Sequence, residues 1–194
     1  MDGSNLITQS ETVETTTTDV VSDATVQAAV RGDRDAYREI YQATSERVYR
    51  LMTRMVGRQE ADDLTQQVFL QAFRKIGQFN GQSKFKTWLY RLATNEALQS
   101  LRRSKRRAAQ ELLNEPTIVF DDPVEAAEEI RLVQDALGQL TPELRTIISL
   151  KEDSGLSYQE IAEAIGVPEG TVGSRLNRAR RELRAILERN GFEG

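Results

Sequence analysis

The sequence contains neither cysteine nor histidine among its 194 residues. The absence of cysteine excludes disulfide bonds and thiolate chemistry, and the absence of both residues removes the usual ligands of zinc. Histidine is also the commonest general base, so its absence lowers the expectation of an enzyme without excluding carboxylate chemistry. No apolar run is long enough to span a bilayer, and the acidic N-terminus lacks the basic start of a signal peptide. We expect a cytoplasmic protein without metal or cofactor.

The charge is divided unevenly along the chain. The net charge of −4 for the whole chain disfavours a nucleic-acid partner. Two acidic segments, however, hide a basic one. Residues 1–30 contain five acidic residues and no Lys or Arg, and residues 108–130 contain seven and none. Residues 31–107 contain 17 basic and 8 acidic residues, a net charge of +9. This local positive field is what attraction to phosphate requires.

Helical periodicity and the absence of useful strand-like alternation predict an all-α fold. We expect two helical domains joined by an acidic linker: residues 1–22 form a disordered acidic, Thr-rich tail, 23–107 a four-helix domain, 108–130 the linker and 131–190 a helix-turn-helix domain. In the first domain, Asp23 and Asp33 are placed as helix N-caps, and Tyr41 falls on an apolar face. The expected helices span residues 23–32, 33–57, about 60–76 and about 84–107, with an Asn-Gly loop at 78–83.

The stretch Ser157–Arg184 has the pattern of a helix-turn-helix. Ser157 and Glu160 stand at capping-box spacing, and Gly166 with Pro168 breaks the first helix. The second helix places its apolar residues on one face and amide, hydroxyl and guanidinium groups on the other, which suits the major groove of DNA. The simpler alternative is a helical hairpin with a solvated basic face.

The fourth helix and the loop before it suggest a contact with melted nucleic acid. Basic side chains follow phosphate, and rings or pockets hold unstacked bases, so a basic helix beside Phe79 and Asn80 suits a single strand. Two simpler interpretations stay open at this point. Phe85 and Trp88 lie on the apolar face and are more typical of a core, and a basic helix end is favoured by the helix dipole alone.

Three stretches, in their order and spacing, resemble the extracytoplasmic-function (ECF) class of bacterial sigma factors within the sigma-70 family. They are DDLTQQVFLQAFRKI (Asp62–Ile76), FKTWLYRLATNEALQSLRR (Phe85–Arg103) and TVGSRLNRARREL (Thr171–Leu183). The resemblance covers about residues 24–187. It implies an alternative sigma factor that binds core RNA polymerase, directs promoter recognition, DNA melting and transcription initiation, and has no catalytic residues of its own.

The resemblance also implies three sets of contact residues. The third helix would dock on core polymerase through Asp63, Gln66, Gln67 and Leu70. The loop and fourth helix would bind the minus-ten element through Phe79, Asn80, Gly81, Lys84, Lys86, Arg91, Asn95, Arg102 and Arg103. The helix-turn-helix would bind the duplex minus-thirty-five element through Thr171, Ser174, Arg175, Asn177, Arg178 and Arg181.

At three places the chain departs from the family's usual pattern. Gln99 stands where the family usually has Asp, so no contact is carried over to it. Gln67 stands where the family more often has Glu, which weakens a charged contact to a neutral one. Gly173 replaces a frequent Lys or Arg and disfavours the helix by about 1 kcal/mol relative to Ala, so we expect weaker minus-thirty-five binding.

The resemblance implies further partners and leaves two rival hypotheses. An anti-sigma factor, often membrane-bound, would hold the protein inactive, and the active protein would be associated with the nucleoid. One rival is a two-domain transcriptional regulator that shares the helix-turn-helix, which the Asp62–Arg103 block disfavours. The other is a nucleic-acid-processing enzyme, for which Asp62–Asp63 and Asp121–Asp122 offer only adjacent carboxylate pairs.

Overall fold

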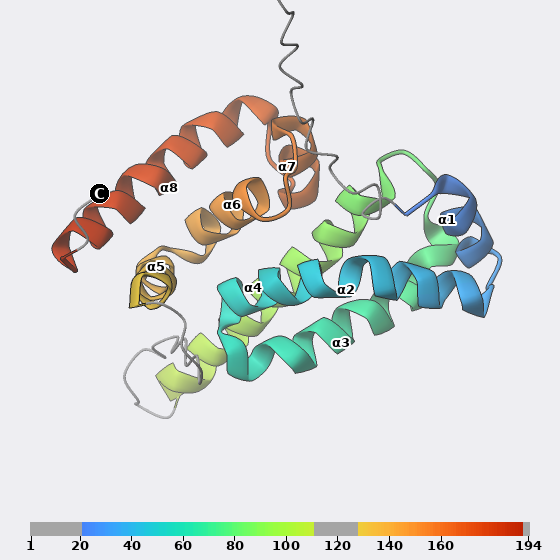
Figure 1. Cartoon of the computed structure of the whole chain (residues 1–194), viewed down its shortest axis with the longest axis horizontal. Coiled ribbons are helices and arrows are strands. Elements are labelled where there is room, and N and C mark those ends of the chain that lie inside the picture. The colour runs from blue at the N-terminus through green and yellow to red at the C-terminus, as the bar shows by residue number, and fades with distance from the viewer. Residues whose placement is uncertain (1–20, 111–127, 192–194) are drawn as a thin grey trace, which may run out of the picture.

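Every secondary-structure element in the described part of the chain is a helix, which confirms the all-α prediction. The structure, a computed structural model, describes residues 21–110 and 128–191. The N-terminal group contains α1 (Asp23–Val30), α2 (Arg34–Val56), α3 (Arg58–Lys75), the short 3-10 helix η2 (Ile76–Gln78) and α4 (Phe85–Gln110). The C-terminal group contains α5 (Glu128–Gln139), α6 (Pro142–Glu152), α7 (Tyr158–Ile165) and α8 (Glu169–Arg189) (Figure 1).

Parts of the expected tail and linker lie outside the described residues. These parts are residues 1–20 of the tail and 111–127 of the linker, with the Asp121–Asp122 pair among them. Helix α4 continues to Gln110, and α5 begins at Glu128, so both helices enter the range assigned to the linker.

The helix starts in the N-terminal group correct two details of the prediction. Ser22, not Asp23, caps α1, because its hydroxyl oxygen accepts a hydrogen bond from the backbone N–H of Thr25 at 3.0 Å. Asp33 caps α2 as predicted. Helix α3 begins at Arg58, earlier than the expected Glu60, because Gly57 has a φ of 84° and reverses the chain at once.

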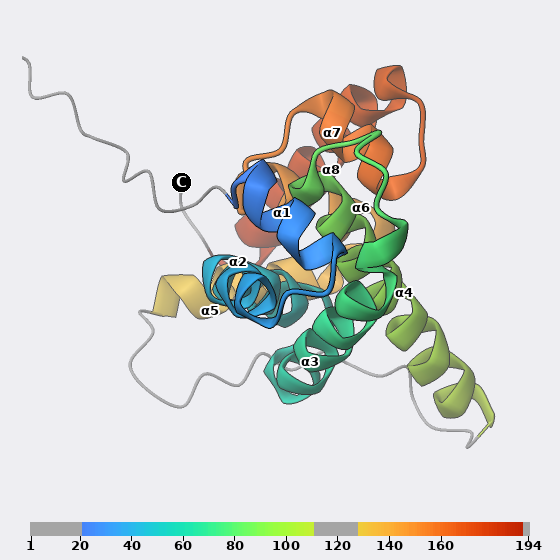
Figure 2. The same cartoon turned by 90° about the vertical axis from the view of Figure 1, so that its right-hand side faces the viewer.

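Helices α2 and α3 lie side by side, and α4 crosses both (Figures 1 and 2). Aromatic side chains fill part of the α2–α3 seam. The Tyr37 ring stacks on Phe73 at 4.7 Å between centroids, and the Tyr41 ring meets Phe69 edge-on at 4.8 Å. Tyr41 nevertheless remains 43% exposed, which corrects its assignment to a buried face. Its ring covers Phe69 from the solvent side.

The helix starts and ends in the C-terminal group follow from local sequence signals. Thr141 caps α6, with Pro142 in the first turn. The capping box of α7 is complete: the Glu160 N–H donates to the Ser157 hydroxyl at 3.2 Å, and the Ser157 N–H donates to the Glu160 carboxylate at 2.8 Å. Gly166 then ends α7 with a φ of 70°, which confirms the predicted turn.

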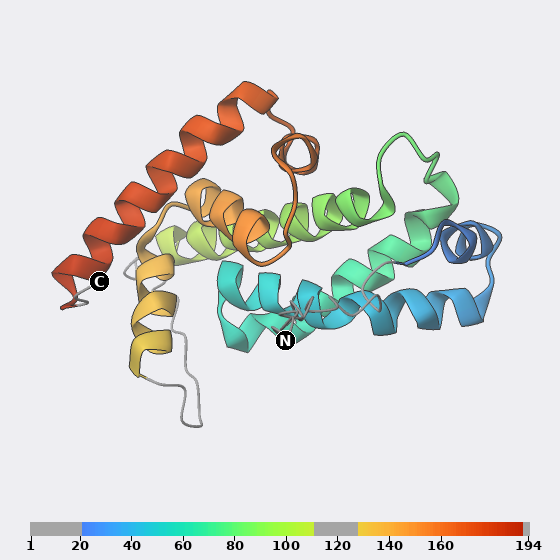
Figure 3. The same cartoon turned by 45° about the horizontal axis from the view of Figure 1, so that its top comes forward.

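The two groups pack directly against each other. Helix α2 contacts α5 and α6, and α4 contacts α6 and α7, so the C-terminal helices pack on both α2 and α4 (Figure 3). Buried apolar side chains from both groups form one cluster, with Leu51 and Leu89 from the first group and Ile147 and Ile161 from the second. The contact between the groups therefore continues the hydrophobic core.

One buried side chain joins the groups through hydrogen bonds. Arg145 on α6 is 3% exposed, and its Nε donates to the Leu137 carbonyl at 2.8 Å. Its Nη2 donates to the carbonyls of Gly138 and Leu140 at 2.5 and 3.0 Å, and its Nη1 donates to the Met55 carbonyl of α2 at 2.8 Å. Burial lowers the pKa of Arg145 to about 10, which leaves the guanidinium charged near neutral pH.

We predict that Arg145→Met lowers the free energy of unfolding by at least about 3 kcal/mol, because four buried carbonyls lose a charged donor. Urea denaturation measures the change. Arg180→Met is the matched control, since the Arg180–Glu152 ion pair is about half exposed and should contribute less than about 1 kcal/mol. Equal losses in the two variants would contradict the role assigned to Arg145.

Candidate polymerase and nucleic-acid interfaces

The predicted polymerase-binding residues share one outward face of α3. Asp63, Gln66, Gln67 and Leu70 are all exposed, whereas Ala61, Leu64 and Val68 of the same helix are buried. Leu70 is 56% exposed and adds one apolar side chain to this otherwise polar face. We call these four exposed residues the docking face.

The predicted promoter-binding residues on α4 form a straight stripe. Arg91, Asn95 and Arg102, together with Gln99, to which no contact was assigned, are exposed at intervals of one helical turn, while Tyr90 and Thr94 beside them are buried. We call this set the melting stripe. Arg103 is exposed next to it, whereas Lys86 is half-buried on another side of the helix. The basic C-terminal end of α4 projects beyond the rest of the fold (Figure 2).

The loop before α4 is more ordered than its Asn-Gly signature indicates. The side chain of Asn80 accepts a hydrogen bond from the backbone N–H of Gln82 at 3.2 Å, and Gly81 has a φ of 73°. Asn80 and Gly81 are exposed. The Phe79 ring is half-buried and lies 5.8 Å from Phe85 and 5.5 Å from Trp88, between ring centroids. Phe79 therefore belongs to an aromatic cluster at the base of the loop.

The second helix of the helix-turn-helix exposes the polar face that the sequence predicts. Ser174, Asn177, Arg178 and Arg181 are exposed, and we call them the recognition face. The opposite side buries Val172, Leu176 and Ala179. Thr171 and Arg175 are half-buried at the edge of this face.

Two side chains of the recognition face already have partners within α8. The Ser174 hydroxyl donates to the Thr171 carbonyl at 3.0 Å, which leaves its oxygen lone pairs free to accept. Arg178 Nε donates to Glu182 at 2.7 Å, but the Arg178 side chain is 61% exposed. An exposed ion pair of this kind contributes little, so DNA can displace it.

Gly173 leaves the ring of Tyr158 uncovered at the edge of the recognition face. A Cβ atom at position 173 would lie 3.6 Å from Tyr158 Cε2, an ordinary contact distance. Tyr158 is 39% exposed, and Lys151 Nζ lies 5.6 Å from the centroid of its ring. This contact was not predicted, since Lys151 and Tyr158 lie on opposite sides of the loop between α6 and α7.

Lys84, a predicted promoter contact, forms an ion pair with the C-terminal group. Its Nζ lies 2.9 Å from Glu160 Oε1, and the Lys84 side chain stays 78% exposed while that of Glu160 is 17% exposed. Glu160 thus serves both the capping box of α7 and the contact with the N-terminal group. The hydrogen bond from the Ser157 backbone is the main cause that lowers the pKa of Glu160, with Lys84 adding to it.

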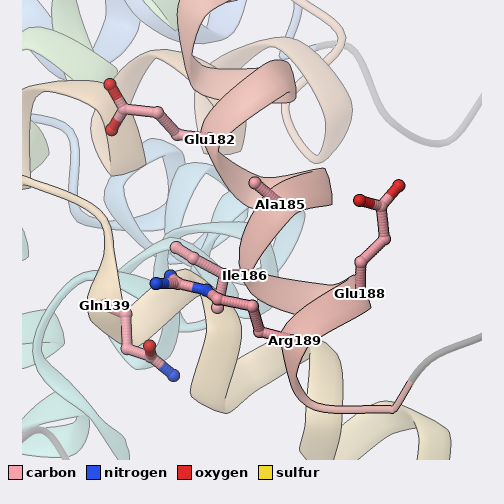
Figure 4. Close-up of a pocket in the computed structure, with 6 residues that line it drawn as sticks. All are labelled: Gln139, Glu182, Ala185, Ile186, Glu188 and Arg189. Carbon is pink, nitrogen blue, oxygen red and sulfur yellow. The ribbon is translucent and has the colours of Figure 1, made fainter.

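A hollow lies between α5 and α8 and includes Glu182, the partner of Arg178. It measures about 680 Å³ and is lined by Gln139, Glu182, Ala185, Ile186, Glu188 and Arg189 (Figure 4). Ile186 forms its apolar part, and none of the predicted contact residues lines it.

No described helix combines the length and the apolar character that a membrane span requires. The described residues contain no group of three or more acidic side chains placed to hold a metal ion.

The helix-turn-helix, with its exposed recognition face, and the basic melting stripe together define an all-helical DNA-binding protein with two modules. Comparison with protein families supports both modules. The family model for sigma-70 region 2 matches residues 40–107, and the model for sigma-70 region 4 matches residues 130–183.

Individual relatives agree with these matches. The chain is 36% identical to the ECF RNA polymerase sigma-E factor of Haemophilus influenzae, over 81% of this chain and 90% of the relative. It is 34% identical to the ECF RNA polymerase sigma factor SigW of Bacillus subtilis, over 84% and 94% of the two chains. Among solved structures, RpoE of Bartonella quintana in complex with the anti-sigma factor NepR shares the fold, with a TM-score of 0.68 and 24% identity over 78% and 96% of the two chains.

The chain belongs to the ECF RNA polymerase sigma factors of the sigma-70 family. It therefore binds core RNA polymerase and directs promoter recognition, DNA melting and transcription initiation. Sigma factors are initiation factors rather than catalysts. The region 2 match decides against the two-domain transcriptional regulator, which would need no such module.

We predict that acid weakens the helix-turn-helix through Glu160. The lowered pKa of this carboxyl means that its stabilising contribution is complete above the ordinary value of 4.5 and is lost as the pH falls through the lowered pKa. Thermal unfolding between neutral and acidic pH should show a steeper loss for the wild type than for Glu160→Gln. An identical pH dependence of the two melting temperatures would contradict this assignment.

Proposed function

We propose that the three exposed faces divide the work of initiation. The docking face binds core polymerase, the melting stripe holds the melted minus-ten strand, and the recognition face reads duplex minus-thirty-five DNA. The observation that carries this proposal is the separation of the faces on three helices. Most of the predicted contact residues on these helices are exposed, while Lys86, Thr171 and Arg175 are half-buried.

The chemistry of the melting stripe suits a single strand. The guanidinium groups of Arg91 and Arg102 are charged donors for phosphate, and the amide of Asn95 between them offers both a donor and an acceptor to a base edge. Arg103 extends the phosphate contacts towards the projecting end of α4. Lys84 and Lys86 would contribute at the start of the helix.

The loop before α4 suits a base that has left the stack. Gly81 and the exposed Asn80 leave the backbone accessible at the turn, and an amide side chain can pair with a base edge. Phe79 is half-buried against Phe85 and Trp88. We assign its ring to the wall of this site, where one edge would contact the base.

The recognition face suits the major groove, with Ser174, Asn177 and Arg178 at base edges and Thr171, Arg175 and Arg181 at phosphates. Position 173 supplies no cation, and a recognition helix with one phosphate contact fewer binds more weakly and with a smaller salt dependence. We therefore propose that this chain depends on its first module for more of its promoter affinity than relatives with a cation at that position.

We propose that residues 23–107 and 131–190 are the two working units and that they separate on the promoter. The names of the two DNA elements place them about 25 base pairs apart, which is about 85 Å along B-form DNA. A packed chain of this length has a radius of gyration of only about 16 Å. The packed arrangement would then be the state of the free chain, and residues 108–130 would span the gap on DNA.

The contact between the two groups has a polar component that favours such opening. Arg54 lies 2.7 Å from Asp153, and this ion pair joins α2 to the end of α6. Burial raises the pKa of Asp153 although Arg54 opposes the shift, so the contact does not fully compensate the carboxylate for lost water. Opening would also break the buried Arg145–Met55 hydrogen bond and expose apolar residues of the shared core, so the free energy of binding to polymerase and DNA has to offset both.

The proposal has three further parts. The chain holds no catalytic residues of its own and works in the cytoplasm, associated with the nucleoid when active. An anti-sigma factor restrains it, and can hold it at the membrane; the support is the relative RpoE, which was solved with its anti-sigma factor NepR. Co-purification from the native cell, with identification of polymerase subunits and of a bound anti-sigma factor, tests these parts together.

We predict that Asn95→Ala and Arg178→Ala separate two functions. Asn95→Ala should impair promoter opening, because the strand loses a base contact, while core binding is unchanged. Arg178→Ala should weaken binding to minus-thirty-five DNA by about 1–3 kcal/mol, and the loss should depend on the base at one position only. Transcription with sigma-free core polymerase and promoter variants measures both. Loss of core binding in Asn95→Ala would place Asn95 on the docking surface, and a uniform loss in Arg178→Ala would make Arg178 a phosphate contact.

We also predict that joining the two groups blocks transcription. The natural chain has no cysteine, so Arg54→Cys with Asp153→Cys introduces the only two thiols. A short bismaleimide crosslinker that contains a reducible bond should abolish promoter-directed transcription, and its reduction should restore it. Each single-cysteine variant, treated with the same reagent, controls for the substitution. Full activity of the crosslinked chain would show that the groups need not separate.

A further inference from the structure

Two polar links cross the seam between α3 and α4. Gln71 Nε2 donates to Glu96 Oε1 at 2.5 Å, and the Ser100 hydroxyl donates to Glu60 Oε2 at 2.8 Å. The seam is otherwise made of apolar residues, among them Leu64, Val68, Ala72, Leu89, Ala93 and Ala97, all of them buried.

Of the two acceptor carboxylates, that of Glu96 depends more on its hydrogen-bond donor, because it is the buried one. Glu96 is 8% exposed, and a buried carboxylate needs a well-placed donor to offset its lost hydration. Gln71 supplies that donor, and its own carbonyl oxygen accepts from Lys75 Nζ at 2.9 Å. The amide of Gln71 is thus held between a cation and an anion, which fixes which end faces Glu96.

These residues lie beside two of the proposed contact faces. Gln71 follows Leu70 and lies one helical turn beyond Gln67, so it is at the half-buried edge of the docking face. Glu96 is buried and follows Asn95, the central residue of the melting stripe. The hydrogen bond therefore joins the edge of the docking face on α3 to the residue next to Asn95 on α4.

We propose that Gln71 and Glu96 are a positioning pair that fixes the melting stripe relative to the docking face. Apolar contacts between small residues are non-directional and tolerate small rotations or slides of one helix on another. A hydrogen bond to a buried carboxylate is directional, and its loss leaves a charge without a partner, so one arrangement of α3 and α4 is selected.

The required accuracy explains why such a pair would matter. A base that leaves the stack must meet Asn95 at about 2.7–3.2 Å, so a displacement of α4 by about 1 Å breaks the contact. Core polymerase holds α3, and the positioning pair then holds α4 relative to polymerase. This inference rests on the proposed roles of the docking face and the melting stripe.

The test is an exchange of the two side chains. Gln71→Glu places two carboxylates face to face in the buried seam and should slow open-complex formation by at least about tenfold. Glu96→Gln keeps an acceptor for Gln71 and should slow it less. The double variant Gln71→Glu with Glu96→Gln restores an amide–carboxylate pair in reverse and should recover the rate to within about threefold of the wild type.

The readouts separate positioning from folding and from docking. Affinity for core polymerase should stay unchanged in all three variants, while open-complex formation, followed by reactivity of unpaired thymines, changes as described. Ser100→Ala is the matched control, because it removes the other polar link of the same seam but leaves Glu60 exposed to water. If Gln71→Glu does not fold, Gln71→Leu with Glu96→Leu replaces the pair by apolar packing and should fold but open promoters slowly.

Four outcomes would overturn the proposal. They are a normal rate in Gln71→Glu, an exchanged double variant as slow as Gln71→Glu, a parallel loss of core affinity, and an equal defect in Ser100→Ala. A different result would contradict the proposed function, namely that Asn95→Ala opens promoters at the normal rate. A normal rate in Gln71→Glu together with a defect in Asn95→Ala would reject the positioning pair alone.

Discussion

The guanidinium of Arg145 satisfies the ends of two helices at once, and the arrangement of the two groups depends on it. The last carbonyls of any α-helix lack partners within the helix. Arg145 supplies donors to Leu137 and Gly138 at the end of α5, to Leu140 just after it, and to Met55 in the last turn of α2. A cation at these helix ends also meets the negative pole of each dipole. The rigid fork of arginine makes this possible, whereas the single ammonium of lysine does not match it.

Helix α4 is constrained from three directions by this packing. Its inner residues pack on α2 and α3, its first half packs on α7, and up to Leu101 only one line of residues is exposed to solvent. The periodicity of a helix then decides which side chains can touch DNA. Arg91, Asn95, Gln99 and Arg102 fall on that line, while Tyr90 and Thr94 cannot. The melting stripe is therefore a consequence of how α4 is buried.

Local features were predictable from sequence because their causes lie within a few residues. The capping box of Ser157 and Glu160, the Asp33 cap and the turn at Gly166 are of this kind. Features that join distant segments were not: Arg145 meets Met55 across 90 residues, and Gln71 meets Glu96 across 25. Neither pairing leaves a periodic signal. Helical periodicity predicted the polar face of α8, whereas the roles proposed for the docking face and the melting stripe came from resemblance to a family. The exposure of Tyr41 was missed because helical spacing gives a direction but not a depth.

The polar contacts between the groups imply an order of events in the proposed function. A bound partner shifts a conformational equilibrium only by its difference in affinity for the two states. Promoter DNA alone is a weak source of such a difference here, because Gly173 removes a cation from the recognition helix and the basic surface is concentrated on the first module. The docking face lies on α3, away from the ion pairs of Arg54 and Lys84, and is available while the groups are still packed. Polymerase can therefore bind the packed chain first, and the energy of that binding can then be used to part the two groups before either DNA element is read.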